Sequence, residues 1–287
     1  MEAIIFALIA FFGWGVGIFF EAIAARKLNS YSFAFWAFLL TVVVLSFYTP
    51  FVVDDLNGLT IHIFLLTVTL AIMALFLGSI SYYEALKIAN RALVGTIASS
   101  FPLVTVILSI LFLKEKISTE QGVAIVIIFL GLFLAMFKGD MFSKKALHSR
   151  GVFFAILTMI AWGVYFAFIK IPIEHIGWFW PNYFSFLIFP LIYFYMKIKK
   201  IRLEKPTHNG AIVTLILSTI FVRIAELSFN FGISKGLVTI VAPISGANPT
   251  LFVILAFLFF KDPITKQQIV GIITTLIGIV LLSIFSV

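Results

Sequence analysis

The chain has 287 residues, of which 62% are apolar and only 11% are charged. Soluble domains carry roughly 25% charged residues, so this composition excludes an ordinary soluble globule and indicates a protein of the lipid bilayer. The net charge of +8 comes from 20 Lys and Arg residues against 12 Asp and Glu residues. The basic residues lie between apolar segments and form no basic stripe, so we expect them to orient the protein in a membrane and expect no nucleic-acid partner.

The sequence carries none of the common catalytic or cofactor motifs. It has no cysteine, which excludes disulfides, thiolate nucleophiles and cysteine metal sites. Its four histidines are scattered without metal-ligand spacing, and no Walker loop, GxSxG or HExxH motif occurs. We therefore expect no enzyme activity, no cofactor and no metal, and an ATP-driven pump is disfavoured.

Apolar runs divide the chain into ten segments, each about the length of a membrane-spanning helix. A bilayer core of about 30 Å takes roughly 20 residues of helix, and lipid offers the backbone no hydrogen-bond partners. The runs are continuously apolar instead of alternating, which disfavours a β-barrel. The ten predicted helices cover residues 3–25, 31–53, 61–83, 93–113, 120–137, 151–170, 178–196, 210–232, 237–260 and 267–286.

An internal duplication organises these ten segments. Residues 94–137 match residues 241–284 without a gap, with 15 identities in 44 positions at a displacement of 147. Shared Pro, Lys, Gln and Gly residues at the same offsets are not expected from apolar composition alone. Near the start of each half, Trp14-Gly15-Val16 matches Trp162-Gly163-Val164. The duplication predicts two units of five helices, at 1–142 and 148–287.

An odd number of helices in each half places the second half in the membrane upside down relative to the first. The predicted fold is therefore an all-α membrane protein with ten transmembrane helices arranged as two inverted five-helix repeats. Secondary transporters often use this symmetry to alternate access around a site near the membrane midplane.

The motifs of the two halves resemble those of the drug/metabolite transporter superfamily, and in particular its EamA-type ten-helix transporters. The resemblance rests on Pro102, Leu113-Lys114-Glu115-Lys116-Ile117-Ser118, Gln121-Gly122 and Gly131, and on their copies Pro249, Lys261-Asp262-Pro263-Ile264-Thr265, Gln268 and Gly278. Asp262 departs from the Glu that the family usually has at this point. The resemblance covers the whole chain and is specific for the fold but weak for the substrate.

The resemblance implies a secondary transporter, most often an exporter, of a small metabolite such as an amino acid. A proton-coupled or a facilitated mechanism would fit the absence of nucleotide motifs. The alternative within transport is efflux of drugs or cationic compounds, with Glu21 or Glu226 as counter-charge. From another class, a non-transporting membrane sensor or scaffold stays open, although no segment between the helices is long enough for a soluble domain.

Charged residues inside apolar segments are costly and are therefore candidates for function. Arg223 lies near the centre of the eighth segment with Glu226 three residues later, on the same helix face. These two residues either neutralise each other or hold a substrate carboxylate and exchange a proton. Glu21 lies in the last turns of the first segment, and Lys170 ends the sixth, where it can extend to water. Glu84 and Lys87 are spaced for an ion pair at the membrane interface.

Aromatic and polar side chains within the spans complete the predicted substrate site. Trp14, Trp162, Tyr165 and Tyr82 could stack on a substrate or pack in the core. Polar groups near helix interruptions either satisfy the backbone or face a cavity, and the helices that line the cavity in the family favour the second role. The polar residues proposed here for the site are Asn230, Asn248 and Ser99.

The distribution of basic residues predicts an orientation. The loops between helices 1–2, 3–4, 5–6, 7–8 and 9–10 hold 15 of the 20 Lys and Arg residues. The positive-inside rule places these loops in the cytoplasm and both termini outside, in a multi-pass protein of the cell membrane. The resemblance implies the opposite orientation, with both termini inside.

Overall fold

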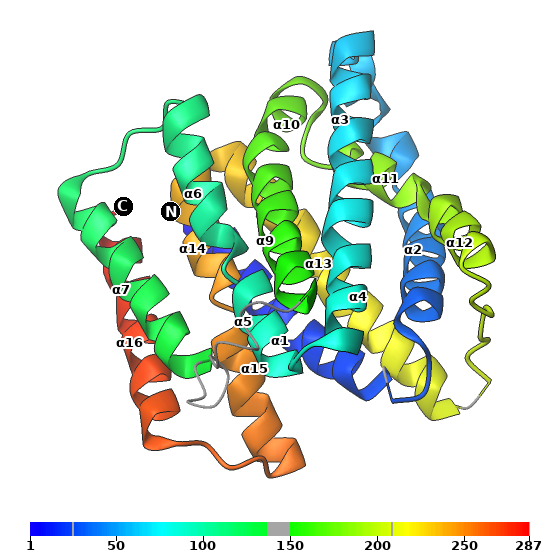
Figure 1. The fold of residues 1–287 in the computed structure, drawn as a ribbon. Coiled ribbons are helices and arrows are strands. Elements are labelled where there is room, and N and C mark those ends of the chain that lie inside the picture. Colours follow the sequence, from blue (N-terminus) through cyan, green and yellow to red (C-terminus); the bar gives the residue numbers. More distant parts are fainter. Residues whose placement is uncertain (25, 137–149, 208, 287) are drawn as a thin grey trace.

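The protein is a helical bundle in a computed structural model that describes residues 1–24, 26–136, 150–207 and 209–286 (Figure 1). Every regular element among these residues is a helix. Eight helices in the described part of the chain are long and apolar enough to cross a membrane. The structure therefore confirms an all-helical chain with multiple apolar helices.

The helices follow the predicted segments closely. The first half contains α1 (Glu2–Ala24), α2 (Ser30–Ser46), η1 (Thr49–Phe51), η2 (Val53–Gly58), α3 (Ile61–Met73), η3 (Ala74–Ile80), α4 (Ser81–Ile88), α5 (Arg91–Ala98), α6 (Phe101–Phe112) and α7 (Thr119–Met136). The second half contains α9 (Arg150–Phe168), α10 (Lys170–Ile176), α11 (Trp180–Leu187), α12 (Phe189–Ile198), α13 (Asn209–Lys235), α14 (Val238–Gly246), α15 (Pro249–Leu255), η5 (Ala256–Phe260) and α16 (Lys266–Ile284).

Two of the ten predicted spans have shorter helices than expected. The segment 31–53 forms α2, which has 17 residues and ends before Pro50, whose ring cannot continue a helical hydrogen-bond ladder. The segment 178–196 is divided into α11 and α12 at Ile188, two residues before Pro190. Whether these two segments cross the bilayer stays a prediction, and so does the total of ten.

The fourth and ninth segments are both interrupted at matching points. The α5–α6 interruption lies at Ser99-Ser100, and the α14–α15 interruption lies at Ala247-Asn248, each followed by a proline in the first turn of the next helix. The two interruptions meet in space, because a Cβ on Gly246 would lie 2.9 Å from Cβ of Pro102. The missing side chain of Gly246 thus permits these helices to pack closely.

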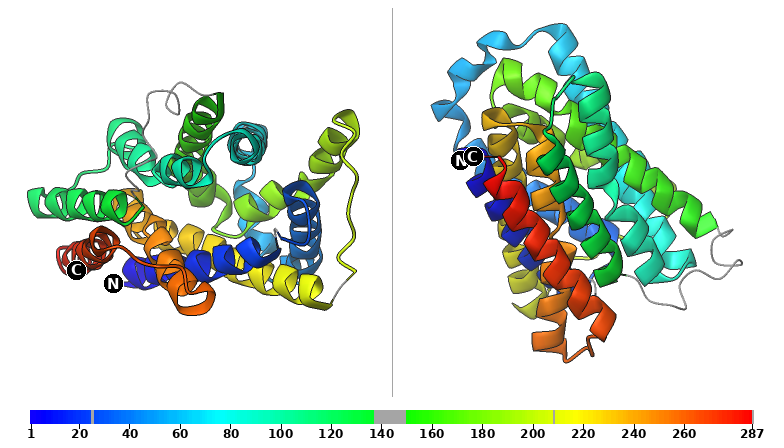
Figure 2. Two further views of the ribbon diagram at one scale, coloured as in Figure 1. Left: turned by 60° about the horizontal axis from the view of Figure 1, so that its bottom comes forward. Right: turned by 90° about the vertical axis from the view of Figure 1, so that its left-hand side faces the viewer.

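Small residues also make reciprocal contacts between the two halves. Gly131 lies against Thr275, and its copy Gly278 lies against Ile128, which corresponds to Thr275 at the displacement of 147. These contacts join α7 to α16 along their length, as Figure 2 shows. They are the contacts expected of two related halves. The inverted relation itself stays a prediction, and the junction expected between residues 142 and 148 lies outside the described residues.

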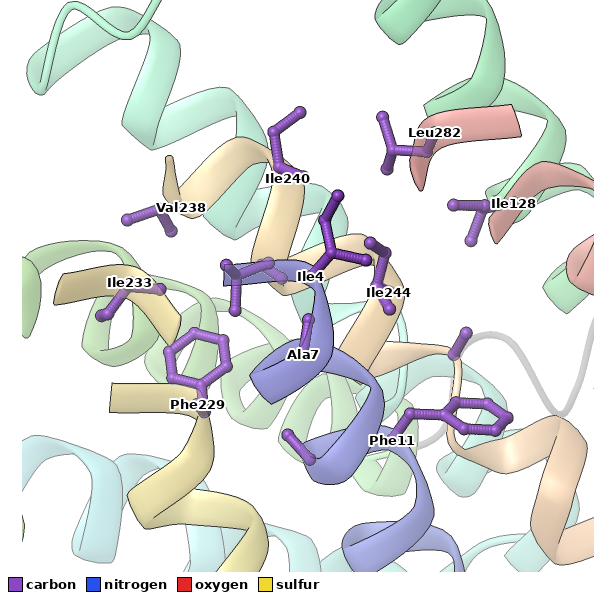
Figure 3. Close-up of a cluster of buried hydrophobic side chains, with 14 of the residues drawn as sticks. Ile4, Ala7, Phe11, Ile128, Phe229, Ile233, Val238, Ile240, Ile244 and Leu282 are labelled. Atoms are coloured by element: carbon purple, nitrogen blue, oxygen red, sulfur yellow. The ribbon is translucent and has the colours of Figure 1, made fainter. Parts of the chain in front are cut away.

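The main hydrophobic core joins α1, α13 and α14 to the α7–α16 pair. Figure 3 shows Ile4 and Ala7 of α1 among residues of α13 and α14, such as Phe229 and Ile244. Phe229 and Ile233 of α13 are fully buried. This core holds α1 and α13 side by side and thereby fixes the charged residues that both helices carry.

Candidate functional site

The charged residues of α13 lie at the middle of the longest run of regular helix in the second half. Arg223 Nη1 lies 2.5 Å from Glu226 Oε2, so the predicted spacing of three residues produces an ion pair. The two side chains are 14% and 23% exposed. The pair is therefore largely but not completely buried.

Two aromatic rings from the other side of the site hold the Arg223 guanidinium. Its Cζ lies 4.4 Å from the ring centroid of Phe186 on α11 and 5.3 Å from that of Phe38 on α2. Nε of Arg223 is buried and has no hydrogen-bond partner among the described residues. The guanidinium has five N–H donors, and the ion pair with Glu226 engages one nitrogen. Donor capacity is therefore left over at this site.

Glu21 of α1 belongs to the same group of charges. It interacts electrostatically with both Arg223 and Glu226, although it forms no ion pair with either among the described residues. Tyr82 and Tyr83 of α4 interact electrostatically with Glu21, and Tyr83 also with Arg223. Three helices thus bring one positive and two negative charges, together with two tyrosines, to one place.

Aromatic residues of α9 lie next to this group. Tyr165 interacts with Arg223 and Glu226, and its hydroxyl lies 3.3 Å from Ser185 Oγ on α11. Trp162 packs against Tyr82 with ring centroids 5.5 Å apart. Trp14 is only 7% exposed and packs against Phe166 and Phe229, so its contacts are those of a core residue.

The three polar residues proposed from sequence have separate surroundings. Asn230 donates to the carbonyl of Trp178 at 3.2 Å, and Asn248 donates to the carbonyl of Ser245 at 3.1 Å. Both side chains thus form hydrogen bonds with backbone carbonyls. This is one of the two roles expected from the sequence, the other being to face a cavity. Ser99 is half-buried at the α5–α6 interruption. Within the described part of the chain, none of these three side chains forms a hydrogen bond with Arg223, Glu226 or Glu21.

The structure shows contacts at the candidate site from several residues that the sequence did not identify. Phe38, Phe186 and Tyr83 are unremarkable in a chain with 35 phenylalanines and 8 tyrosines, and only their contacts distinguish them. Lys170 does not extend to water but donates to the carbonyls of Ile233 and Gly236, at the C-terminal end of α13. There its charge complements the helix dipole.

Glu115, which the sequence offered only as part of a family motif, joins the two halves. Its carboxylate accepts hydrogen bonds from the backbone N–H groups of Val238 and Thr239, each at 2.8 Å. These are the first two residues of α14, so the carboxylate caps that helix. We call this contact the Glu115 cap. It ties the loop after α6 to the interrupted ninth segment.

The EamA-like transporter family matches this chain over residues 1–137 and 149–284. The chain is 24% identical over 296 residues to an uncharacterized transporter of Archaeoglobus fulgidus, covering 98% of each chain. It is 31% identical over 136 residues to an uncharacterized protein of Methanocaldococcus jannaschii, and this match covers 46% of the present chain and 96% of that protein.

The fold has a counterpart among solved structures. One crystal structure superposes with a TM-score of 0.80 over 99% of this chain and 97% of its own, at 15% sequence identity, a likeness that concerns the fold alone. The family match covers nearly the whole sequence, including both motif copies. The chain is therefore a multi-pass membrane protein that belongs to the EamA-like transporter family.

Proposed function

We propose that this protein is a secondary transporter of a small metabolite with a carboxylate and an amino group, and that Arg223, Glu226 and Glu21 form its substrate site. The observation that carries the proposal is the Arg223 guanidinium, which lies mid-helix with an unpartnered Nε beside two carboxylates. A charge within a membrane helix is retained at a cost of at least about 2.5 kcal/mol, which favours a functional role.

Arg223 is suited to bind the carboxylate of the substrate. Its planar guanidinium can bind a carboxylate through two parallel hydrogen bonds, and the rings of Phe38 and Phe186 hold it in place. A substrate carboxylate would use the donors that Glu226 leaves free, or would displace Glu226.

Glu21 is suited to bind the amino group. With both carboxylates ionised, Glu21, Arg223 and Glu226 sum to a charge of −1. Binding a zwitterion leaves this sum unchanged, so a proton on one of the carboxylates would make the loaded site neutral. This count supports proton coupling through Glu21 or Glu226.

The same negative sum favours a second candidate function, the efflux of cationic compounds. Trp162, Tyr82 and Tyr165 lie beside the carboxylates, and aromatic faces attract cations. In this alternative Glu21 or Glu226 is the counter-charge, and Arg223 lowers the affinity for the substrate instead of raising it.

Alternating access would involve the two ends of the molecule in turn. At one end, the Glu115 cap joins the halves. Asp262, its copy at the displacement of 147, has no side-chain hydrogen bond to any residue that the structure describes. This difference supports a mechanism in which the halves, as inverted repeats, rock so that the cap at one end opens while an equivalent contact of Asp262 forms at the other.

A ligand-stabilisation assay tests the site directly. Purified protein is heated in the presence of each of the common amino acids and of the organic cation tetraphenylphosphonium, because a ligand that binds the folded state raises its apparent stability. We expect at least one amino acid to stabilise the wild type and Arg202→Gln, which removes an exposed arginine outside the site. Arg223→Gln should lose this response and Arg223→Lys should weaken it. Stabilisation only by the cation, undiminished in Arg223→Gln, would instead support efflux of cationic compounds.

We also propose that both termini lie outside the cytoplasm, on the basis of the basic residues in the alternate loops. A reporter that is active only in the cytoplasm, fused after Val287, should be silent. The same reporter inserted between Lys200 and Arg202 should be active. A bright signal from the fusion at Val287 would overturn this orientation.

A further inference from the structure

A cavity of about 500 Å³ lies apart from the Arg223 site, between the ends of α4, α9 and α12. Its polar lining comes from Ser81, Glu84 and Lys87 of α4, from Tyr195 of α12, and from Lys199 directly after α12. Phe154 of α9 also lines it. No residue of the Arg223 group lines it. Figure 1 shows α12, which contributes to the lining, at the outer edge of the bundle.

The charges of this cavity do not cancel. Glu84 is occupied by two groups: Lys87 Nζ at 3.0 Å and the hydroxyl of Tyr31, which donates to the same carboxylate oxygen. Lys199 forms no ion pair among the described residues; its ammonium lies 5.9 Å from the ring centroid of Tyr195. Two ammonium groups therefore lie near one carboxylate, and Lys199 interacts with it electrostatically without forming an ion pair. The three charged side chains of the lining give the cavity a formal net charge of +1.

A packed wall separates the cavity from the centre of the bundle. Tyr31 is 2% exposed, and its ring packs against those of Tyr83 and Tyr195 with centroids 5.4 and 5.6 Å away. Leu75 and Met196 are buried in the same cluster. An anion that enters the cavity therefore comes from the membrane surface and not from the Arg223 site.

Exposed apolar residues adjoin the lining residues in the sequence. Phe153, next to Phe154, is 63% exposed, and Phe194 and Ile198 on α12 are 61% and 62% exposed. The helices that carry these exposed residues thus combine apolar outer surface with a cavity whose formal charge is positive. A phosphate head attached to acyl chains matches this combination, because its head binds ammonium groups while its chains cover the apolar flanks.

We propose that the cavity between α4, α9 and α12 is a binding site for the phosphate of an anionic membrane lipid, with Lys199 and Lys87 as its ligands. Tyr195 belongs to the same lining, and its hydroxyl interacts with Tyr31 and Glu84. This proposal does not depend on the proposed substrate site, because lipid binding in this cavity does not require that Arg223 binds a carboxylate.

Native mass spectrometry of the detergent-solubilised full chain tests the proposal. Phosphatidylglycerol and phosphatidylcholine are titrated separately into the wild type, Lys199→Gln, Lys87→Gln and Lys197→Gln. Lys197 is the matched control, because it lies two residues before Lys199, in the last turn of α12, but faces the ring of Tyr193 and does not line the cavity. We expect phosphatidylglycerol to bind the wild type and Lys197→Gln equally, and expect Lys199→Gln and Lys87→Gln to weaken it by about fivefold each.

The other arms of the experiment identify the source of the phosphate. Inorganic phosphate at millimolar concentration should compete with phosphatidylglycerol for the wild type, which would support phosphate as the recognised group. Stabilisation by inorganic phosphate without any binding of phosphatidylglycerol would overturn the lipid as the occupant. Equal weakening by Lys197→Gln, or equal binding of phosphatidylcholine, would overturn the site itself. Unchanged unfolding temperatures of the lipid-free variants would exclude misfolding as the cause of any loss.

Discussion

Two ion pairs with the same spacing occupy different surroundings in this protein. Arg223 and Glu226 on α13, and Glu84 and Lys87 on α4, are each three residues apart and lie 2.5 and 3.0 Å from each other. The first pair lies mid-helix with side chains 14% and 23% exposed, whereas the Lys87 and Glu84 side chains are 51% and 31% exposed. Spacing alone thus predicts that both pairs form, but burial decides what each pair contributes.

The neighbours of the two pairs differ as well. Arg223 lies between the rings of Phe38 and Phe186 and near a second carboxylate, Glu21. Lys87 lies over the ring of Tyr31 and is open to the surroundings on its other side. The buried pair is therefore a constrained arrangement with donors left over, and the outer pair is an ordinary interfacial pair beside a cavity. This contrast leads to three stability predictions.

The largest effect is expected from Glu226→Gln, because this change removes the only carboxylate that forms an ion pair with Arg223 among the described residues and leaves Glu21 as its more distant counter-charge. The free energy of unfolding should fall by about 2.5 kcal/mol or more. Reversible denaturation in mixed micelles would measure the loss. A change below about 1 kcal/mol would mean that Glu226 is not the main partner of Arg223.

An intermediate effect is expected from Glu115→Ala, which removes the Glu115 cap from the first turn of α14. Loss of a helix cap costs about 0.5–2 kcal/mol, and we expect about 1–2 kcal/mol because the carboxylate accepts two N–H groups. The same denaturation assay applies, with Glu120→Ala as control, because Glu120 is exposed in the nearby first turn of α7. Equal effects of the two variants would rule out a specific cap.

The smallest effect is expected from Lys87→Gln. Partly exposed ion pairs contribute roughly 0–1 kcal/mol, since water screens both charges and the side chains lose freedom. The unfolding free energy should therefore change by less than about 1 kcal/mol. A loss as large as that of Glu226→Gln would remove the distinction between the two pairs.

The helices were predictable because apolar runs of membrane length leave the backbone no alternative to internal hydrogen bonds. The lengths of α2 and of α11 with α12 were less predictable, since Pro50 and Pro190 interrupt runs whose composition stays apolar. Hydropathy describes how strongly the side chains of a segment prefer lipid to water. It does not show where a proline breaks the backbone hydrogen bonds of the helix.

The candidate site was predictable only where charge made a residue conspicuous. Arg223, Glu226 and Glu21 stand out in an apolar background, and the structure brings them together. Phe38 and Phe186 could not be selected among so many phenylalanines, because their contact with Arg223 joins residues 185 and 37 positions apart in the chain. For Asn230 and Asn248, the sequence predicts that each buried amide needs a hydrogen-bond partner. It does not predict that this partner is a backbone carbonyl, as it is in the structure.

The central claim is that Arg223 and Glu226 bind substrate and do more than neutralise each other. The most direct test is counterflow of amino acids in proteoliposomes that contain the double variant Arg223→Leu/Glu226→Gln, which leaves neither charge unpaired. The matched control is Glu84→Gln/Lys87→Leu, which removes the outer pair. The account predicts that the first variant folds but has lost transport, while the control transports as the wild type does. Wild-type counterflow in Arg223→Leu/Glu226→Gln would contradict it.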